Sequence, residues 1–340
     1  MSYKDDLARV ASLPLPWDKL EGCNILITGA TGLIGSCLVE ILMSRQDKSF
    51  NVYASGRNKE RALKRFANYK DDPCFHFVSY DVMSPLDCDI NFDYIIHAAS
   101  NASPNFFAEK PVEVIKSNIM GTCNLLDYGM KHNIRRFLFV SSGEVYGEGD
   151  GMVFDEEYSG YVNPAKPRSC YPSSKRAAET LCVSYGSEYG IDTVIARPSH
   201  TYGPHFTEAD NRVYAQFIRN VMDGKDIVMK STGAQFRSWC YVVDCASAIL
   251  HILLKGENGV AYNIADSESN ISIRELAEMV ASIGGKKVVI ELPSDQEKAG
   301  YNVVTKSVFA TERLQSLGWS PMSSMLDNMK KTIEEVSRKG

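Results

Sequence analysis

The sequence predicts an α/β protein with a Rossmann-type, doubly wound parallel sheet and a smaller C-terminal substrate lobe. Three observations lead to this prediction. A glycine-rich turn lies between a short apolar run and an apolar-periodic segment near the start of the chain. Patterns typical of buried strands alternate with helical patterns up to residue 196. From residue 197 this alternation breaks down, and segments rich in glycine, proline and charge take over.

The first strand and the first helix of the predicted sheet flank the glycine-rich turn, at residues 24–27 and 34–44. Further short apolar runs predict strands at residues 50–55, 74–79, 94–97, 137–141 and 193–196. Longer amphipathic patterns between them predict helices at residues 59–69, 111–132 and 173–189. Strands that alternate with helices form βαβ units, which predicts a parallel sheet. We therefore assign residues 1–196 mainly to a dinucleotide-binding domain.

The remaining residues, 197–340, are expected to form mainly the smaller lobe, with some elements returning to the first domain. Helices are predicted there at residues 213–223, 243–254, 272–283 and 325–336. In open α/β sheets, ligands bind outside the carboxyl ends of the strands. We therefore expect this lobe to cover that edge of the sheet and to bind the substrate.

Composition and charge exclude several classes of protein. The chain has 340 residues, of which 44% are hydrophobic, so it is long and apolar enough to bury a core. Its net charge of -5 and the lack of a basic block argue against a nucleic-acid partner. The first 17 residues carry charges and no apolar run, so neither a secretion signal nor a membrane span is expected. Nine scattered cysteines predict reduced thiols in a cytoplasmic protein, and histidines without ligand spacing predict no metal.

The glycine-rich turn carries the pattern Gly29-x-x-Gly32-x-x-Gly35, which follows a predicted strand and opens a predicted helix. This context is the one that a dinucleotide-binding turn requires. Glycines allow the backbone to turn tightly and to approach a pyrophosphate closely, and the helix N-terminus favours its negative charge. A tight turn without a ligand is the alternative. We expect a nicotinamide dinucleotide here.

The residues after the second predicted strand bear on the choice between NAD and NADP. Sites for NAD usually carry an acid there, which binds the ribose 2′-hydroxyl. Residues 53–58 contain no acid. Arg57 would suit a 2′-phosphate, and its alternative is a solvated side chain before a charged helix. We expect NAD and keep NADP as an alternative, with Asp81, after the third strand, placed to reach the adenine.

A second motif, far downstream, predicts proton transfer. Tyr171 and Lys175 are four residues apart, so they share one face of a helix. A nearby ammonium and a bound nicotinamide cation would favour the phenolate form of a tyrosine and bring its pKa toward the working pH. Ser142 follows the strand predicted at residues 137–141, where its hydroxyl would share the substrate hydroxyl with Tyr171. Glu144, two residues further on, is either a third acid–base group or a carboxylate that caps a loop.

With these motifs, the chain resembles the extended short-chain dehydrogenase/reductase family over about residues 22–335. The further marks of the resemblance are His97-Ala98-Ala99-Ser100, Asn118-x-x-Gly121-Thr122 and Arg197-Pro198. Within the family, the chain is most similar to UDP-glucuronate decarboxylases, in segments 81–86, 97–104, 111–118, 142–147, 201–204, 211–213 and 237–239. The resemblance implies a nucleotide-diphosphate sugar as substrate, NAD as cofactor, and a homodimer formed through the helices at 111–132 and 173–189.

The resemblance also implies which residues bind the ligands. The cofactor residues would be Gly29, Thr31, Gly32, Leu33, Ile34, Gly35, Arg57, Asp81, Val82, Ala98, Ala99, Ser100, Asn118, Tyr171, Lys175 and Ser199. The substrate residues would be Ser103, Glu144, His200, His205, Arg212 and Arg237. Two arginines suit a dianionic diphosphate or a sugar acid. His205 stands where decarboxylases usually carry arginine, and His200 lies near the position of an asparagine that faces the substrate.

Members of the family share a first step, in which Tyr171 would remove the C4 hydroxyl proton while a hydride passes to the cofactor. A 4-keto sugar with a carboxylate at C6 then loses CO2, one with a hydroxymethyl group loses water, and one that rotates is epimerised at C4. Glu144 argues against simple epimerisation. TDP-glucose dehydratases carry an acid at the position of Gly143, so the glycine favours decarboxylation of UDP-glucuronate to UDP-xylose.

Dehydration and C4 epimerisation stay open as alternatives, and the cofactor is expected to end every turnover oxidised. A cofactor-sensing protein without catalysis is a further alternative. The presence of Ser142, Tyr171 and Lys175 argues against it.

Overall fold

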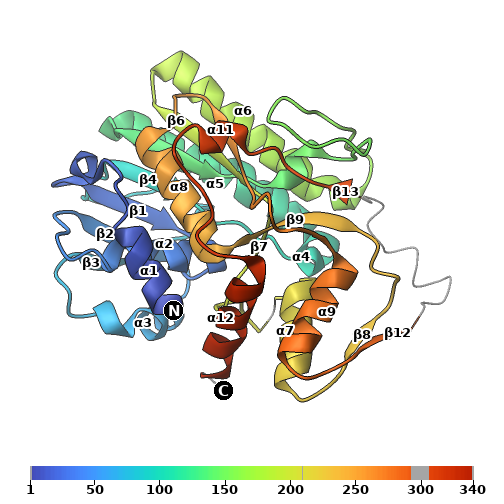
Figure 1. Cartoon of the computed structure of the whole chain (residues 1–340). Helices are drawn as coiled ribbons and strands as arrows, with labels where there is room; N and C mark the ends of the chain where they lie inside the picture. Colours follow the sequence, from blue (N-terminus) through green and yellow to red (C-terminus); the bar gives the residue numbers. More distant parts are fainter. Residues whose placement is uncertain (1, 209, 292–305, 339–340) are drawn as a thin grey trace.

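A parallel sheet of seven strands forms the centre of the computed structural model, which describes residues 2–208, 210–291 and 306–338 (Figure 1). The strand order is β3-β2-β1-β4-β5-β6-β10, and all six neighbouring pairs are parallel. The strands are β1 (Asn24–Thr28), β2 (Asn51–Gly56), β3 (Phe75–Ser79), β4 (Tyr94–His97), β5 (Arg136–Val140), β6 (Thr193–Pro198) and β10 (Ala261–Ile264). The central strands are apolar and buried on both sides, as parallel sheets require. The predicted doubly wound fold is confirmed.

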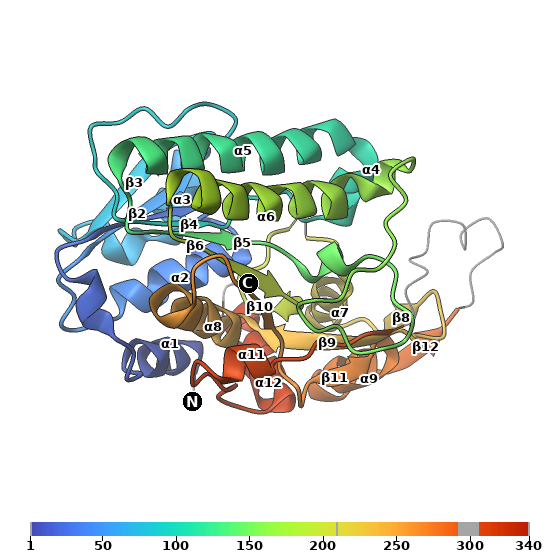
Figure 2. The ribbon, with the colours of Figure 1, turned by 90° about the horizontal axis from the view of Figure 1, so that it is seen from above.

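Helices cover both faces of this sheet (Figure 2). Long helices α5 and α6 lie side by side on one face, and α2 and α8 pack against each other on the opposite face. The helices of the first domain, together with α8, are α1 (Tyr3–Ala11), α2 (Leu33–Met43), α3 (Lys59–Arg65), α4 (Pro104–Glu109), α5 (Pro111–His132), α6 (Cys170–Tyr189) and α8 (Val242–Lys255). Short 3₁₀ turns are η1 (Trp17–Leu20), η2 (Ala67–Tyr69), η3 (Gly143–Tyr146) and η4 (Pro167–Ser169).

Two predicted helices differ from the structure by three residues or more at one end, whereas the others agree to within one residue at each end. The helix expected at residues 59–69 ends at Arg65, and a separate turn follows, because Phe66 leaves helical geometry and packs its ring 5.4 Å from that of Phe75. The helix expected from residue 173 begins at Cys170. Proline is tolerated in the first turn of a helix, where no N–H partner is lost, so Pro172 does not delay its start. Tyr171 therefore lies inside the first turn of α6.

The chain beyond residue 197 is more regular than its composition indicates. A second sheet joins β11 (Asn270–Ser272), β9 (Phe236–Tyr241), β13 (Lys306–Ser307) and β7 (His200–Tyr202), and β8 (Ile227–Met229) pairs with β12 (Val288–Ile290). The helices here are α7 (Val213–Met222), α9 (Ile273–Ile283), α11 (Glu312–Gln315) and α12 (Met325–Ser337). Because β7 follows directly after β6, this sheet lies at the carboxyl edge of the large one. No helix in the described ranges is both long and apolar enough to cross a bilayer.

Helices from distant parts of the chain meet next to α8. Lys331 of α12 donates hydrogen bonds to both carboxylate oxygens of Asp6 in α1, at 3.0 and 2.9 Å, and both side chains are buried. Asp244 of α8 lies in the same region and accepts a hydrogen bond from the backbone N–H of Met322. Burial raises the pKa of Asp244 to about 7; the Met322 N–H opposes this, and the nearby carboxylates of Asp266 and Asp6 add to it.

We expect Asp244→Asn to change how stability depends on pH. In the unfolded chain the pKa of Asp244 is about 4, the ordinary value for an aspartate. In the folded protein it is higher, so the proton stays bound to a higher pH. The stabilisation from Asp244 is therefore present below about pH 4 and is lost as the pH rises through its folded pKa. Urea unfolding at pH 5 and pH 8 should show a larger loss of stability in the wild type than in the variant. Equal losses would contradict this, and the exposed Asp223→Asn variant is the control.

Candidate active site

The glycine-rich turn joins β1 to α2 at the carboxyl edge of the sheet. Gly29 has a φ of +67°, and a Cβ there would lie 2.6 Å from the carbonyl oxygen of Ala98. A Cβ on Gly35 would collide with the carbonyl oxygen of Gly29. Gly32 is the N-cap of α2 and provides no side chain to bond the first N–H groups of this helix. The turn thus forms a cradle of bare backbone, which suits a pyrophosphate.

Two buried hydroxyl groups support a ligand at this edge. Ser55 Oγ, on β2, and Ser199 Oγ, between β6 and β7, have no hydrogen-bond partner among the described residues. Leaving a buried hydroxyl unsatisfied is unfavourable, so polar groups of a bound molecule would stabilise both. The cradle and the two hydroxyls together fit a dinucleotide. Ser199 was predicted as a cofactor residue, whereas no sequence motif indicated Ser55.

Charged side chains lie around the loop after β2 and the glycine-rich turn, and the sequence indicated only some of them. Arg57 is largely exposed, and its Nη1 lies 4.0 Å from Oε1 of Glu113 in α5. Arg61 donates a hydrogen bond to the carbonyl oxygen of Thr31 at 3.0 Å, which fixes the glycine turn from α3. No periodicity links residues 57 and 113, so the acid next to Arg57 could not be found from the sequence. Asp81 accepts a hydrogen bond from the N–H of Met83 at 3.1 Å.

The other predicted cofactor residues lie on loops and helix starts at the same edge. They are Leu33 and Ile34 at the start of α2, Val82 after β3, Ala98, Ala99 and Ser100 after β4, and Asn118 in α5. Ser100 donates to Oδ1 of Asn118 at 2.8 Å, and the amide of Asn118 donates to Ser174 at 2.9 Å. Asn118 therefore connects the loop after β4 to α6, next to Lys175.

Helix α6 places the two residues of the proton-transfer motif one turn apart. Tyr171 and Lys175 are both buried. The ammonium of Lys175 donates to the carbonyl oxygen of Val140, at the end of β5, at 2.8 Å. It lies 5.8 Å from the centre of the Tyr171 ring. The structure therefore brings the strand end that precedes Ser142 together with the helix that carries both residues.

The chain's own groups, without a bound cofactor, do not bring the pKa of Tyr171 toward the working pH. Burial raises the pKa of Tyr171 to about 12; a hydrogen bond with Ser142 opposes this, and the charge of Glu144 adds to it. Burial also lowers the pKa of Lys175 to about 7. The ammonium that was expected to favour the phenolate is thus itself disfavoured. A second positive charge near the phenol is needed for ionisation at neutral pH.

Glu144 has a partner that the sequence did not indicate. Arg168 Nη2 lies 2.7 and 2.9 Å from the two carboxylate oxygens of Glu144. The Arg168 guanidinium also lies over the ring of Phe107, at 4.8 Å, and that ring stacks on Tyr171 with a centroid distance of 4.6 Å. Ser142 caps the turn that carries Glu144 by accepting a hydrogen bond from its backbone N–H at 3.2 Å. Glu144 is therefore held on two sides.

The predicted substrate arginines come from the C-terminal part of the chain. Arg212, the N-cap residue of α7, is held by Asp210 and by the carbonyl oxygen of Thr201. Arg237 lies on β9 and is buried. Burial lowers its pKa, and the charge of Glu144 opposes that change. The charge of Arg212 likewise influences the pKa of Tyr171, so both arginines lie in the electrostatic neighbourhood of the reaction centre. Asp210 was not predicted.

The remaining predicted substrate residues are spread over this part of the molecule. The ring of His200, an exposed residue of β7, lies 5.3 Å from that of Trp239. Ser103, the N-cap of α4, donates to Asn211 at 3.0 Å and so connects α4 to the loop before α7. His205 packs edge-on against the ring of Tyr3 in α1, at 4.9 Å.

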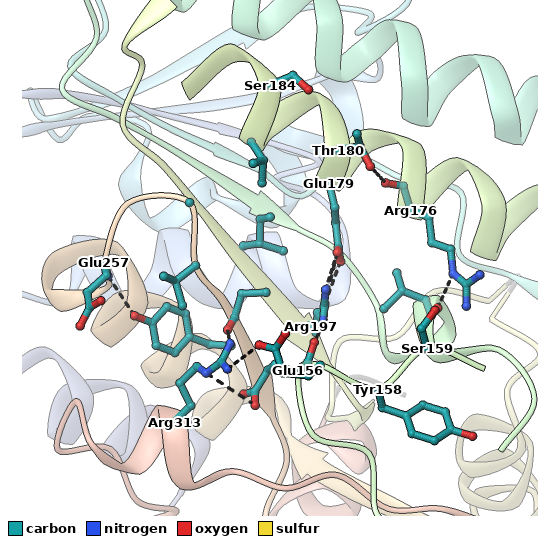
Figure 3. A pocket seen from close by; sticks show the side chains of 18 of the residues that line it. Glu156, Tyr158, Ser159, Arg176, Glu179, Thr180, Ser184, Arg197, Glu257 and Arg313 are labelled. Atoms are coloured by element: carbon teal, nitrogen blue, oxygen red, sulfur yellow. Dashed lines mark hydrogen bonds and ion pairs between the residues drawn. The ribbon is translucent and has the colours of Figure 1, made fainter. Parts of the chain in front are cut away.

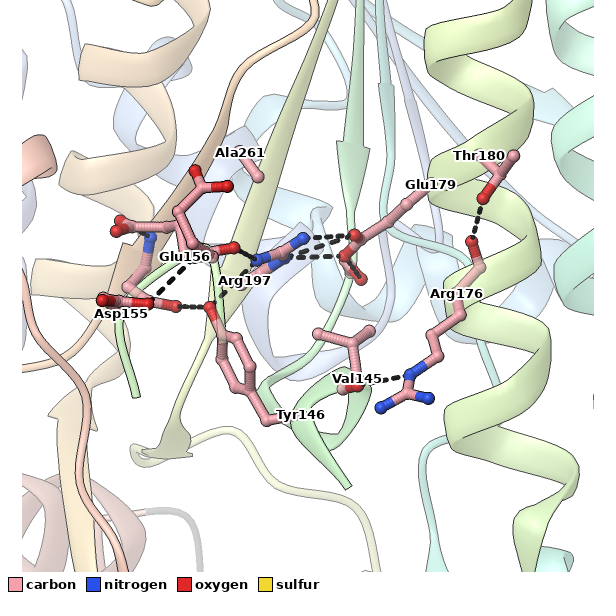
Figure 4. Close-up of polar contacts among 12 residues, drawn as sticks. Val145, Tyr146, Asp155, Glu156, Arg176, Glu179, Thr180, Arg197 and Ala261 are labelled. Atoms are coloured by element: carbon pink, nitrogen blue, oxygen red, sulfur yellow. Dashed lines mark hydrogen bonds and ion pairs between the residues drawn. The ribbon is translucent and has the colours of Figure 1, made fainter. Parts of the chain in front are cut away.

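A separate cavity of about 910 Å³ opens beside α6 (Figure 3). Its lining, within the described parts of the chain, includes no residue of the predicted site. Its floor is an ion pair in which Arg197 lies 2.7 Å from Glu179, with Tyr146 and the backbone of Glu156 accepting further bonds from Arg197 (Figure 4). Glu179 also accepts a hydrogen bond from Ser141. This network therefore connects Ser141, just after β5, to α6 and β6.

The backbone cradle and the buried Tyr171–Lys175 pair, both at the carboxyl edge of the sheet, are the features expected of a Rossmann-type enzyme that binds a dinucleotide. The chain belongs to the NAD dependent epimerase/dehydratase family, whose family model matches residues 25–265. The resemblance to extended short-chain dehydrogenases/reductases is thereby confirmed.

The proteins to which the chain is similar include enzymes named for nucleotide-sugar substrates. The chain is 33% identical over 313 residues to UDP-glucuronic acid decarboxylase 5 of Arabidopsis thaliana, covering 90% of this chain and 87% of the relative. It is 30% identical to UDP-glucuronic acid decarboxylase 1 of Danio rerio, covering 93% and 73%. A UDP-glucose 4-epimerase from Thermotoga maritima, solved with UDP-glucose, superposes with a TM-score of 0.79 at 25% identity, covering 93% and 99%. A dTDP-glucose 4,6-dehydratase from Streptomyces venezuelae, solved with NAD, matches in fold with a TM-score of 0.79 at 23% identity, covering 93% and 97%.

Proposed function

We propose that the protein decarboxylates UDP-glucuronate to UDP-xylose with a bound NAD. The similarity to UDP-glucuronic acid decarboxylases supports the substrate. Within the molecule, the observation that carries the choice of reaction is the position before Glu144. A Cβ on Gly143 would collide with the ring of Phe309, so the acid that a dehydratase would place at this position requires that buried ring to move. Among the residues that the structure describes, Glu144 is the carboxylate whose charge acts on Tyr171.

The positive charges of the site support an acidic sugar. Arg237 is buried, and its charge interacts with that of Glu144. Guanidinium groups bind carboxylates and phosphates well. Arg212, which Asp210 holds in place, adds a second guanidinium whose charge acts on Tyr171. The pair suits a substrate that carries both a diphosphate and a carboxylate.

The residues of the chain divide the reaction as follows. NAD bound on the turn from Gly29 to Gly35 would supply reversible hydride acceptance from C4 of the sugar. Tyr171 accepts the proton of the C4 hydroxyl, and Ser142 hydrogen-bonds that oxygen. The C4 ketone makes the C6 carboxylate a β-keto acid, so the C5–C6 bond breaks, CO2 leaves and the electron pair stays on C5 and its enolate. C5 then takes up one proton from solvent, and we assign Glu144 to relay it through a water molecule. Tyr171 would return its proton to the C4 oxygen as C4 takes back the hydride, which gives UDP-xylose and leaves the cofactor oxidised.

The test is to incubate the purified protein with NAD, and separately with NADP, and to offer UDP-glucuronate, UDP-glucose, TDP-glucose and GDP-mannose. Mass spectrometry should show that only UDP-glucuronate reacts, with loss of one CO2, with NAD favoured and no accumulation of reduced cofactor. Loss of one water from a neutral hexose nucleotide would establish a dehydratase and refute the proposal. A product of unchanged mass that is epimerised at C4 would establish an epimerase and would also refute the proposal.

We also propose that the protein is a cytoplasmic homodimer that pairs through α5 and α6. Val112, Ile115 and Met120 of α5 and Val183 of α6 are large apolar residues that are exposed in the single chain. The nine cysteines are all unpaired, which supports a reducing compartment. Light scattering should give the mass of a dimer, and Ile115→Glu with Met120→Glu should give a monomer. A monomeric wild type would refute this interface.

A further inference from the structure

We propose that Arg168 determines the specificity for acidic sugars, because it neutralises Glu144 and so allows a second carboxylate to bind beside it. This inference rests on the proposed function. The residues predicted from the sequence include Glu144 but not its partner Arg168. Arg168 lies in η4, just ahead of the helix that carries Tyr171.

The geometry fixes the Arg168 side chain between two groups of the reaction centre. One nitrogen, Nη2, contacts both oxygens of the Glu144 carboxylate, at 2.7 and 2.9 Å. The guanidinium plane lies over Phe107, whose ring stacks on Tyr171 with an angle of 24° between the planes. Burial acts to lower the pKa of Arg168, but Glu144 raises it, with a net increase, so the cation stays charged.

The Glu144 carboxylate lies where the sugar must react. Its charge acts to raise the pKa of Tyr171 and also that of Arg237, so it lies within electrostatic range of the base and of a predicted substrate residue. A uronate substrate places its own carboxylate on the carbon next to the one that is protonated. Two carboxylates at such close range repel each other even though the Glu144 side chain is partly exposed to solvent.

Arg168 removes that repulsion. With the arginine present, the pair has no net charge, so an anionic sugar does not meet the uncompensated negative charge of Glu144. Without it, the negative charge of Glu144 would act on a uronate but not on a neutral sugar such as xylose. The loss of affinity should therefore be selective for the acidic ligand, which a general disturbance of the structure would not produce.

The test uses the NAD-loaded protein with Tyr171→Phe, which binds ligands without turnover, and titration calorimetry with UDP-glucuronate and UDP-xylose. We expect Arg168→Met to weaken UDP-glucuronate binding by roughly 10- to 100-fold and to leave UDP-xylose binding nearly unchanged. Adding Glu144→Gln to Arg168→Met should restore UDP-glucuronate binding to within about threefold, because the repelling charge is then gone. Arg168→Lys, which keeps the charge, should retain most of the affinity.

Arg176→Met is the matched control, because this part-buried arginine of α6 bonds the backbone of Val145 and Gly160 and contacts no carboxylate of the site. It should affect both ligands equally. Equal losses for both ligands in Arg168→Met would show a structural role and overturn the proposal. Failure of Glu144→Gln to restore binding would overturn it too, since Arg168 would then contact the substrate directly. If the wild type does not decarboxylate UDP-glucuronate, the proposed function falls and this inference with it; otherwise the two fail separately.

Discussion

Tyr171→Phe should lower turnover by at least ~100-fold, the usual contribution of a general acid–base group, and should leave NAD binding intact. The substitution removes only the hydroxyl that accepts the C4 proton. The ring keeps its stack on Phe107, 4.6 Å away, so the first turn of α6 should stay in place. Turnover is measured as product formed from UDP-glucuronate, and NAD affinity is measured by titration calorimetry on the same preparation.

Tyr185→Phe is a suitable control because this tyrosine lies on the same helix and its hydroxyl donates to Asp127 at 2.6 Å, away from the strand ends. We expect it to keep nearly full turnover. Wild-type turnover in Tyr171→Phe would remove Tyr171 from the mechanism, and loss of NAD binding would show that the variant had disturbed the site as a whole.

Gly29→Ala should abolish NAD binding and destabilise the protein. Its φ of +67° already disfavours alanine, and the new Cβ would lie 2.6 Å from the carbonyl oxygen of Ala98 and 2.7 Å from Cα of Ala99. These are backbone atoms of the loop after β4, so the turn must move away from the sheet edge to relieve the clash. Urea unfolding and NAD titration on the same variant measure both effects.

The chain offers a matched control at Gly22, which has a φ of +70° and no atom within 4 Å of the position that a Cβ would take. Gly22→Ala should cost about 1–2 kcal/mol for the left-handed conformation and should not change NAD affinity. The difference between the two variants isolates the close backbone approach at Gly29. If both variants bound NAD equally well, the cradle would not be the cofactor site.

The sequence predicted the large sheet well because its strands are buried on both faces and its helices are long. The strand at residues 94–97 and the helix at residues 111–132 have the predicted bounds. Most strands of the second sheet, such as β13, have only two or three residues and carry no recognisable period, so this sheet was not predicted. The four-residue edge strand β10 was also not predicted, although β4 has the same length.

The motif residues of the site were found because their spacing along the chain is fixed by local geometry, as with Tyr171 and Lys175 on one helix turn. The partners that hold them were not. Arg168 and Glu144 meet through tertiary structure across 24 residues, and Asp210 bonds Arg212 in a loop without a repeating pattern. Pairs of this kind depend on the fold rather than on spacing, so the sequence pattern alone does not show them.

The return of β10 to the large sheet bears on how this enzyme could be recombined with relatives. The strand pairs with β6 through residues such as Tyr262 and Ala196, although β7, α7, β8, β9 and α8 lie between the two strands in the chain. The second sheet is built from strands on both sides of β10 in the chain, so it is not a detachable C-terminal cassette. A chimera cut once near Pro198 would exchange the edge of the cofactor sheet along with the lobe. Crossovers that preserve this edge must leave β10 in place, and the late pairing of so distant a strand is expected to slow folding.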